Sequence, residues 1–331
     1  MNKSRFGEID FLRAFGILAI IVIHTNAYYL ESPLAKFIWN YSQFAVQTFV
    51  FCSAYIFFQK EAFKKEFAFF SYFKKRLKRL VLPYYYYLIF FIPLVSLLNP
   101  KRVGIDYIVR QVTLTTTNLD LNWFIVLFLY FALLMPFISY LYKNKKLLFY
   151  LFCLLSLGSS LFFISNQLPI NYKLTMWLPW SLIIIFALYF ARFEQKKMFV
   201  IWSLFVSCIL FLVLRYWLII GSHSLAFFDN KYPPNFYFLI YGIFLTILLF
   251  YLAKLRIFNM HYSRKVVHFL SIHSYSIFFI HFLLIFFLDY LFDLKIFTWW
   301  QFFTIILIST IIIQLGLIKV KTVTNYLFSI L

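Results

Sequence analysis

The feature that most limits what this chain can fold into is a series of long apolar segments separated by short basic ones. Each apolar segment is close to the roughly 20 residues that an α-helix needs to cross the hydrocarbon core of a bilayer. Hydrophobic residues make up 64% of the 331-residue chain, and charged residues make up only 13%. A soluble protein of this length cannot bury so much apolar surface, whereas a bilayer accepts it. The sequence therefore predicts an integral membrane protein.

Ten of these segments are long enough to cross the membrane, so the expected fold is an all-α, polytopic transmembrane helix bundle. The sequence shows no flexible linker, internal repeat or low-complexity tail. We therefore expect a single membrane domain over residues 1–331 with no appended soluble domain, so that any chemistry falls to the bundle and its loops. The predicted spans are residues 9–30, 38–59, 80–98, 122–142, 147–164, 175–191, 198–220, 235–253, 268–290 and 298–318.

The basic residues give the expected orientation, because cytoplasmic loops carry an excess of Lys and Arg. With the N-terminus in the cytoplasm, 22 of the 31 Lys and Arg residues fall on the cytoplasmic side and 7 on the outer side. Ten spans with both termini in the cytoplasm fit this asymmetry, and we expect a multi-pass protein of the cytoplasmic membrane. The outer residues are Lys36, Lys101, Arg102, Arg110, Lys173, Lys231 and Lys295.

A net charge of +20 is also typical of proteins that bind nucleic acids. Here the basic residues recur between apolar segments instead of forming one patch, so we expect membrane lipids and not nucleic acid as partners. The three cysteines lie inside apolar segments and show no spacing typical of disulfides or zinc ligands. We therefore expect no metal.

Two ionisable side chains, Arg13 and His24, interrupt the first apolar segment. Such groups are costly inside a bilayer and mark candidate functional sites. The two residues are 11 positions apart, so in a helix they share a face and are separated by about 16 Å along the axis. Arg13 is then a candidate anion binder near the cytoplasmic entrance, and His24 a candidate proton acceptor deeper in the membrane. The alternatives are an arginine that reaches lipid phosphates and a histidine that only packs.

The residues around this pair form a recognisable pattern. Residues 8–15 read Glu-Ile-Asp-Phe-Leu-Arg-Ala-Phe, and His24 follows after a further apolar stretch. This resembles the opening of the acyltransferase family 3 membrane proteins, which has an acidic residue, a Leu-Arg-Ala run, ten residues and a histidine. The resemblance implies an acyl-CoA donor, usually acetyl-CoA, and a carbohydrate hydroxyl as acceptor. It also implies that His24 takes part in the transfer as a base or transient acyl carrier, and Arg13 is the second catalytic candidate. Asp10 would orient Arg13 or the substrate, or simply begin the helix.

A basic segment, Arg76-Leu77-Lys78-Arg79, is similar to an Arg-x-x-Arg segment of the same family. Residues three apart lie on one helical face, and arginine binds phosphate through paired donors. The resemblance therefore implies that Arg76 and Arg79 bind the phosphates of CoA. Without it, the same residues would be ordinary cytoplasmic anchors of the third span.

Three weaker similarities lie along the chain. Residues 121–124, Leu-Asn-Trp-Phe, resemble the entrance to the family's fourth helix and make Trp123 a substrate-lining candidate, although a tryptophan at the interface needs no functional explanation. Residues 49–55 resemble a Phe-Phe-x-x-Ser-Gly-Tyr pattern, with Ala54 in place of glycine. Residues 274–281 resemble a Ser-x-x-Ile-Tyr-x-x-His run without its tyrosine, which makes Ser274 and His281 further substrate-lining candidates. His281 could equally be a packing residue.

Together these patterns predict a membrane O-acyltransferase that moves an acyl group, expected to be acetyl, from cytoplasmic acyl-CoA to a hydroxyl of a cell-envelope or extracellular carbohydrate. The envelope polysaccharide synthesis machinery is the expected protein partner. The main alternative is a transporter, flippase or exporter of a polysaccharide or lipid-linked sugar; transporters usually show related halves and helices broken by Gly or Pro. A second alternative is a non-catalytic scaffold. For His261, His268 and His273 we expect a solvated position at the cytoplasmic surface.

Overall fold

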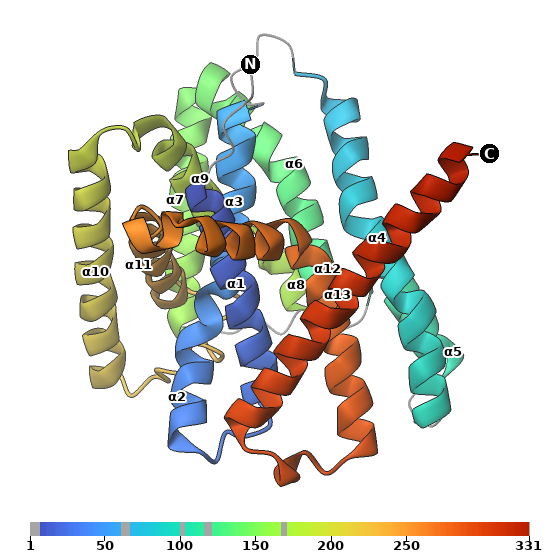
Figure 1. The fold of residues 1–331 in the computed structure, drawn as a ribbon. Helices are drawn as coiled ribbons and strands as arrows, with labels where there is room; N and C mark the ends of the chain where they lie inside the picture. The colour runs from blue at the N-terminus through green and yellow to red at the C-terminus, as the bar shows by residue number, and fades with distance from the viewer. Residues whose placement is uncertain (1–6, 61–66, 100–102, 116–120, 167–170, 331) are drawn as a thin grey trace. The chain divides into compact units, whose positions relative to one another are not determined.

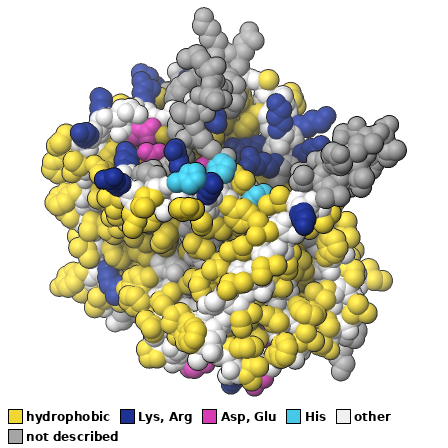
Figure 2. Space-filling view, viewed as in Figure 1, with side chains coloured by type: hydrophobic (Ala, Val, Ile, Leu, Met, Phe, Trp, Pro, Cys, Tyr) yellow, Lys and Arg dark blue, Asp and Glu magenta, His cyan; other side chains and the backbone are white. Residues whose placement is uncertain are grey.

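The computed structural model describes residues 7–60, 67–99, 103–115, 121–166 and 171–330, and for residues 259 and 321–330 it describes the backbone alone. Within these residues the chain is helical, with 3-10 turns and no strand. Hydrophobic side chains cover most of the face seen in Figure 2. Seven described helices are long and apolar enough to cross a membrane. The predicted all-α membrane bundle is confirmed, while the number of ten spans and the side of the termini stay predictions.

The chain divides into two compact units. Unit 1 consists of residues 1–43 and 256–331, so it joins the two ends of the chain. In this unit α1 packs against α2, α12 and α13, and α12 packs against α13. The helices of unit 1 (Figure 1) are α1 (Gly7–Asn26), α2 (Pro33–Tyr41), α12 (His261–Leu291) and α13 (Trp299–Ile330), with 3-10 turns η3 (Arg256–Asn259) and η4 (Leu294–Ile296).

Unit 2 contains the middle of the chain, residues 44–255. In this unit α9 packs against α3, α7 and α6, and α11 packs against α3 and α10. Its helices (Figure 1) are α3 (Ala45–Lys60), α4 (Phe69–Leu98), α5 (Ile105–Thr113), α6 (Asn122–Asn144), α7 (Lys146–Ser165), α8 (Tyr172–Thr175), α9 (Trp177–Phe193), α10 (Lys197–Ile220) and α11 (Phe236–Leu252).

The predicted second span, 38–59, is not one helix. The chain forms α2 up to Tyr41, a 3-10 turn at Ser42–Phe44, and then α3. Ser32 begins α2 as its N-cap, with Pro33 in the first turn, where a missing N–H costs nothing. The side chain of Gln43 donates to the carbonyl of Trp39 (3.3 Å) at the break. A window of hydropathy runs across such a short polar turn, which explains the error.

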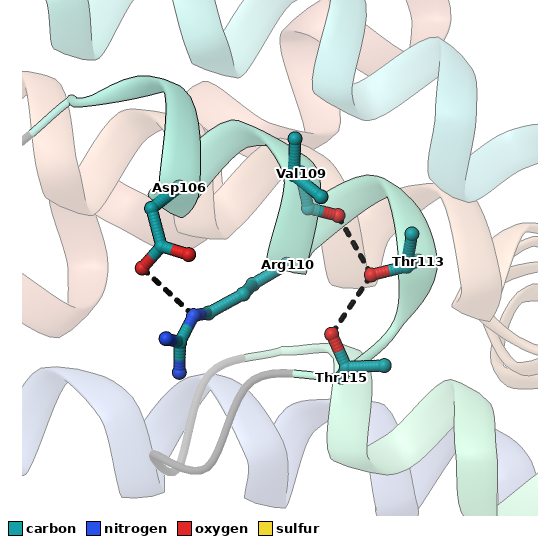
Figure 3. A network of polar contacts seen from close by, with 5 residues as sticks. All are labelled: Asp106, Val109, Arg110, Thr113 and Thr115. Atoms are coloured by element: carbon teal, nitrogen blue, oxygen red, sulfur yellow. Dashed lines mark hydrogen bonds and ion pairs between the residues drawn. The ribbon is translucent and has the colours of Figure 1, made fainter.

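Other predicted spans are helical, but the observed helices begin or end at different residues. The first helix ends at Asn26 and not near residue 30, and α4 begins at Phe69, eleven residues before the predicted start, so its basic segment is helical. The short helix α5 lies in a predicted outer loop. There Arg110 pairs with Asp106 (2.8 Å) along one exposed face, and Thr113 bonds the carbonyl of Val109 (2.7 Å), as Figure 3 shows. Of the residues used for the orientation, the following lie outside the described ones: Lys3, Arg5, Lys64, Lys65, Lys101 and Arg102.

A close contact holds α3 and α11 together within unit 2. The buried side chain of Gln47 donates to the carbonyl of Phe238 (2.6 Å). A Cβ at Gly242 would overlap the Gln47 carboxamide, so only glycine leaves room for this bond. Beside it, Thr48 and Thr246 share a hydrogen bond (3.3 Å). Hydrogen bonds of this kind satisfy polar groups that are buried between helices, away from water.

Candidate functional site

Helices α1 and α12 of unit 1 run in the same direction, as polar contacts at three levels along them show. Ser271 contacts Asp10 near the start of α1, His281 contacts His24 near its end, and Asp289 contacts Tyr28 just beyond it. Residue numbers increase together on both helices, so the pair is parallel. This register brings His24 and His281, 257 positions apart in sequence, into direct contact.

The two histidines form a hydrogen-bonded pair inside the bundle. Nδ1 of His24 lies 2.9 Å from Nε2 of His281, and the rings are near parallel, with an interplanar angle of 17°. His281 is fully buried, whereas His24 is half-buried. The ring of Phe282 covers the pair, with its centroid 4.2 Å from that of His24. Of the two rings, only that of His24 is partly exposed.

The backbone of α12 sets the tautomers of both rings. Nδ1 of His281 lies 3.0 Å from the carbonyl oxygen of Ile277, and a carbonyl oxygen only accepts, so Nδ1 carries a proton. In the neutral ring Nε2 of His281 is then an acceptor, and it receives the Nδ1–H of His24. Neutral His24 consequently has its lone pair on Nε2. This is the tautomer that a general base or a nucleophile requires.

Asp10 lies at the other end of α1 and is buried. One carboxylate oxygen accepts from the hydroxyl of Ser271 (2.7 Å), and the other lies 3.5 Å from Nδ1 of His268. Asp10 therefore joins α1 to α12. The expected solvated position of His268 is only partly right, because its side chain is 48% exposed but contacts this carboxylate. Ser274 is buried and donates to the carbonyl of Ser271 within α12 (3.0 Å).

Arg13 is half-buried on α1, one turn from Asp10. Its guanidinium makes no hydrogen bond or ion pair with any described residue, and Asp10 is among the residues it does not pair with. A half-buried guanidinium retains strong donors for a planar or multiply charged anion. Arg13 thus has the chemistry expected of an anion binder at the start of the helix that carries His24.

Sequence reasoning missed a further polar cluster between α12 and α13. The amide of Gln314 donates to Nδ1 of His273 (3.1 Å), and its oxygen accepts from the hydroxyl of Ser276 (2.5 Å). The one available signal was a glutamine in the middle of an apolar segment. His273 is therefore half-buried and bonded, and not a solvated surface group.

The remaining candidates belong to unit 2. Arg76 of α4 is half-buried; it donates to the hydroxyl of Ser53 on α3 (3.1 Å) and covers the ring of Tyr72. Ser53 belongs to the motif of residues 49–55, so the structure joins two motifs that were recognised separately. Arg79 is exposed on the same helix. Whether these arginines act together with His24 stays a prediction.

Trp123 is buried at the start of α6, with 9% of its surface exposed. The ammonium group of Lys231 lies 5.5 Å from the centre of its ring. For metals, no group of three or more His, Cys, Asp or Glu side chains among the described residues is placed to hold an ion.

Two parallel helices thus carry a histidine pair, an arginine and a carboxylate, in a chain with seven described helices that are long and apolar enough to cross a membrane. These features define a membrane protein with a polar site between helices. The profile of the acyltransferase domain family, acyltransferase family 3, matches residues 6–318. The chain belongs to this family. The match extends over residues 140–265, where the sequence carries almost no recognisable motif. A comparison with curated proteins finds no significant match, and neither does one with solved structures.

Proposed function

We propose that this protein transfers an acyl group from cytoplasmic acyl-CoA to a hydroxyl of a cell-envelope or extracellular carbohydrate. Membership of an acyltransferase family gives the class of reaction. The observation that carries the proposal is the pair of His24 and His281, because its tautomers leave a basic nitrogen on the half-buried ring. Acetyl is the expected acyl group, and the cytoplasmic membrane is the expected location.

In the proposed reaction Nε2 of His24 takes the proton of the acceptor hydroxyl while the hydroxyl oxygen attacks the thioester carbonyl. The C–S bond breaks, the ester forms, and CoA leaves as a thiolate that recovers the proton. When His24 is protonated, its Nδ1–H bond to His281 becomes charge-assisted and stronger. His281 is thus a positioning residue that stabilises the imidazolium as it forms.

The donor is proposed to bind through its phosphates to arginines. Arg13 lies on the same helix as His24, and Arg76 is fixed by Ser53 and Tyr72. Arg79 follows Arg76 by three residues on α4 and is exposed to the solution in which a charged donor arrives. Paired guanidinium donors suit the several phosphate groups of CoA.

The test uses membrane vesicles of known orientation and acetyl-CoA labelled in its acetyl group. We expect label to enter the carbohydrate fraction only when the donor has access to the cytoplasmic face. Arg13→Ala should raise the KM for acetyl-CoA at least about tenfold, since one charge-assisted contact is worth about 1.5–3 kcal/mol. Lys36→Ala, at an exposed outer position, is the matched control and should leave KM unchanged. Absence of label with intact wild-type vesicles and their native acceptor would reject the proposal.

A further inference from the structure

The first turns of α12 in unit 1 are not explained by the acyl-transfer site. This helix has 31 residues, whereas a helix needs roughly 20 to cross a bilayer. Residues 261–270 of α12 precede Ser271, which contacts Asp10, whereas only residues 7–9 of α1 precede Asp10. About three turns of α12 therefore extend past the start of α1, on the side predicted to be cytoplasmic.

This extension of α12 is open to its surroundings. Figure 1 shows it crossing the start of α1, where Ser271 and His268 contact the carboxylate of Asp10, before the helix continues in the direction of α1. Six of residues 261–270 are exposed and only one is buried, in contrast to the helix around His281. The extension is therefore attached to α1 at its end near Asp10 and exposed along the rest of its length.

One face of the extension is basic. Arg264, Lys265 and His268 are exposed, and their spacing of three and four residues places them on one stripe of the helix. Neither Arg264 nor Lys265 forms an ion pair within the part of the chain that the structure describes. The stripe therefore presents two positive charges at neutral pH that no described carboxylate neutralises.

A second face of the same turns is apolar. Tyr262, Val266 and Phe269 also follow one another at helical spacing, and the exposed fractions of Tyr262 and Val266 are 81% and 59%. At about 100° per residue, this apolar stripe lies roughly a third of a turn from the basic one. A helix that exposes a basic stripe and an apolar stripe is suited to the boundary between water and lipid.

The two stripes together select the kind of partner. Over α12 in Figure 2, histidine and basic side chains lie above apolar ones. An anionic lipid fits both stripes at once, because its phosphate pairs with the cations and its acyl chains cover the apolar side chains. A soluble phosphate compound would pair with the cations but would leave Tyr262 and Val266 in water. The structure therefore favours a lipid over a soluble anion.

We propose that the first turns of α12 lie in the membrane interface and bind anionic phospholipids, with Arg264 and Lys265 on the phosphate groups and Tyr262 and Val266 among the acyl chains. His268, at the end of the basic stripe, lies 3.5 Å from Asp10 and so connects the lipid site with α1. This lipid site is independent of the acyl-transfer reaction. It is also more specific than the general excess of basic residues in cytoplasmic loops, because it selects the headgroup at one segment.

The experiment places a tryptophan reporter in the apolar stripe of the purified full-length protein, as Tyr262→Trp. The vesicles contain equal parts of phosphatidylglycerol and phosphatidylcholine, and only one of the two lipids carries bromine, which quenches tryptophan, on its acyl chains. The signal of the eight native tryptophans, measured without the substitution, is subtracted. We expect brominated phosphatidylglycerol to quench the reporter at least about threefold more than brominated phosphatidylcholine. Equal quenching by both lipids, or quenching by neither, would overturn the proposal.

Variants locate the site. Arg264→Gln combined with Lys265→Gln should remove the preference, so that both brominated lipids quench the reporter equally. The matched control, Lys145→Gln combined with Lys146→Gln, removes two consecutive exposed lysines from another predicted cytoplasmic segment and should leave the preference unchanged. A preference that survives the loss of Arg264 and Lys265 would overturn the proposal. If that double variant fails to reconstitute, high salt applied to the reporter protein decides, because screening should lower the preference at least about twofold, and a preference unaffected by salt would overturn the proposal.

Discussion

Helices α1 and α10 are both apolar and of similar length, yet they occupy opposite environments. Thirteen of the 20 residues of α1 are buried, whereas only three of the 24 residues of α10 are. Asp10, Arg13 and His24 all lie on α1, while Arg215 is the one charged residue of α10 after its first position. Hydropathy alone therefore does not separate a mostly buried helix from a mostly exposed one. The number of ionisable residues within the apolar segment does so better, because lipid tolerates such residues poorly.

The comparison predicts unequal effects of the same substitution on stability. Ile21→Ala in α1 should lower the free energy of unfolding by about 2–5 kcal/mol, because Ile21 is fully buried and leaves a cavity. Ile209→Ala in α10 should change it by less than about 0.5 kcal/mol, since that side chain is 42% exposed. Thermal unfolding in detergent gives both values. Equal losses would show that α10 packs as tightly as α1.

A second prediction tests whether His281, on the helix α12 that packs against α1, positions His24 or only packs. His281→Leu should lower the rate of acyl transfer roughly 10- to 100-fold, because His24 loses the acceptor that fixes its tautomer. His281→Gln retains an acceptor and should recover part of the rate. The pH profile of the rate should change in His281→Leu, which a purely structural role would not cause. If Leu and Gln give the same rate and profile, His281 only packs.

Much of this arrangement was predictable from sequence, and the reasons for the rest are physical. Apolar length predicts helices, and motif resemblance selected Arg13, His24 and His281 as candidates. The bond between the two histidines was not predictable, because it depends on the register of helices 257 positions apart. The same holds for Asp10 with Ser271.

Loops were the least predictable part of the chain. Burial of a lysine such as Lys231 follows from the packing of three distant segments and leaves no periodic pattern in the sequence. The break at residues 42–44 falls on two polar residues, Ser42 and Gln43, and long apolar windows conceal such a short break.

A third prediction concerns the buried charge of Lys231 and its effect on stability at different pH values. Burial lowers the pKa of Lys231 from 10.5 to about 7, so between these values the unfolded chain holds a proton that the folded protein has released. Stability therefore rises with pH in this window, by up to about 1.4 kcal/mol per pH unit, and below pH 7 the cost of the buried charge is fully present.

The measurement is the thermal stability of Lys231→Met relative to wild type at pH 6 to 9.5. Lys231→Met should be the more stable protein at pH 6, and its advantage should shrink as the pH rises. The ring of Tyr232 lies against the Lys231 ammonium, and burial, with Tyr172 nearby, raises the pKa of Tyr232 well above its usual value of 10. Lys295→Met is the control. A constant difference across the range would contradict a lowered pKa.

The central claim is that Nε2 of His24 takes the proton of the acceptor hydroxyl during acyl transfer. The most direct test is the rate at which labelled acetyl groups enter the native carbohydrate fraction in membranes that contain His24→Ala. We predict a loss of about 100-fold or more, since general bases contribute about 10²–10⁴. The unfolding free energy should fall by no more than about 1–3 kcal/mol, the cost of leaving the buried His281 acceptor without its donor. The control is His261→Ala, an exposed histidine at the start of α12, which should transfer at the wild-type rate. A His24→Ala protein that transfers within about twofold of wild type would contradict the account.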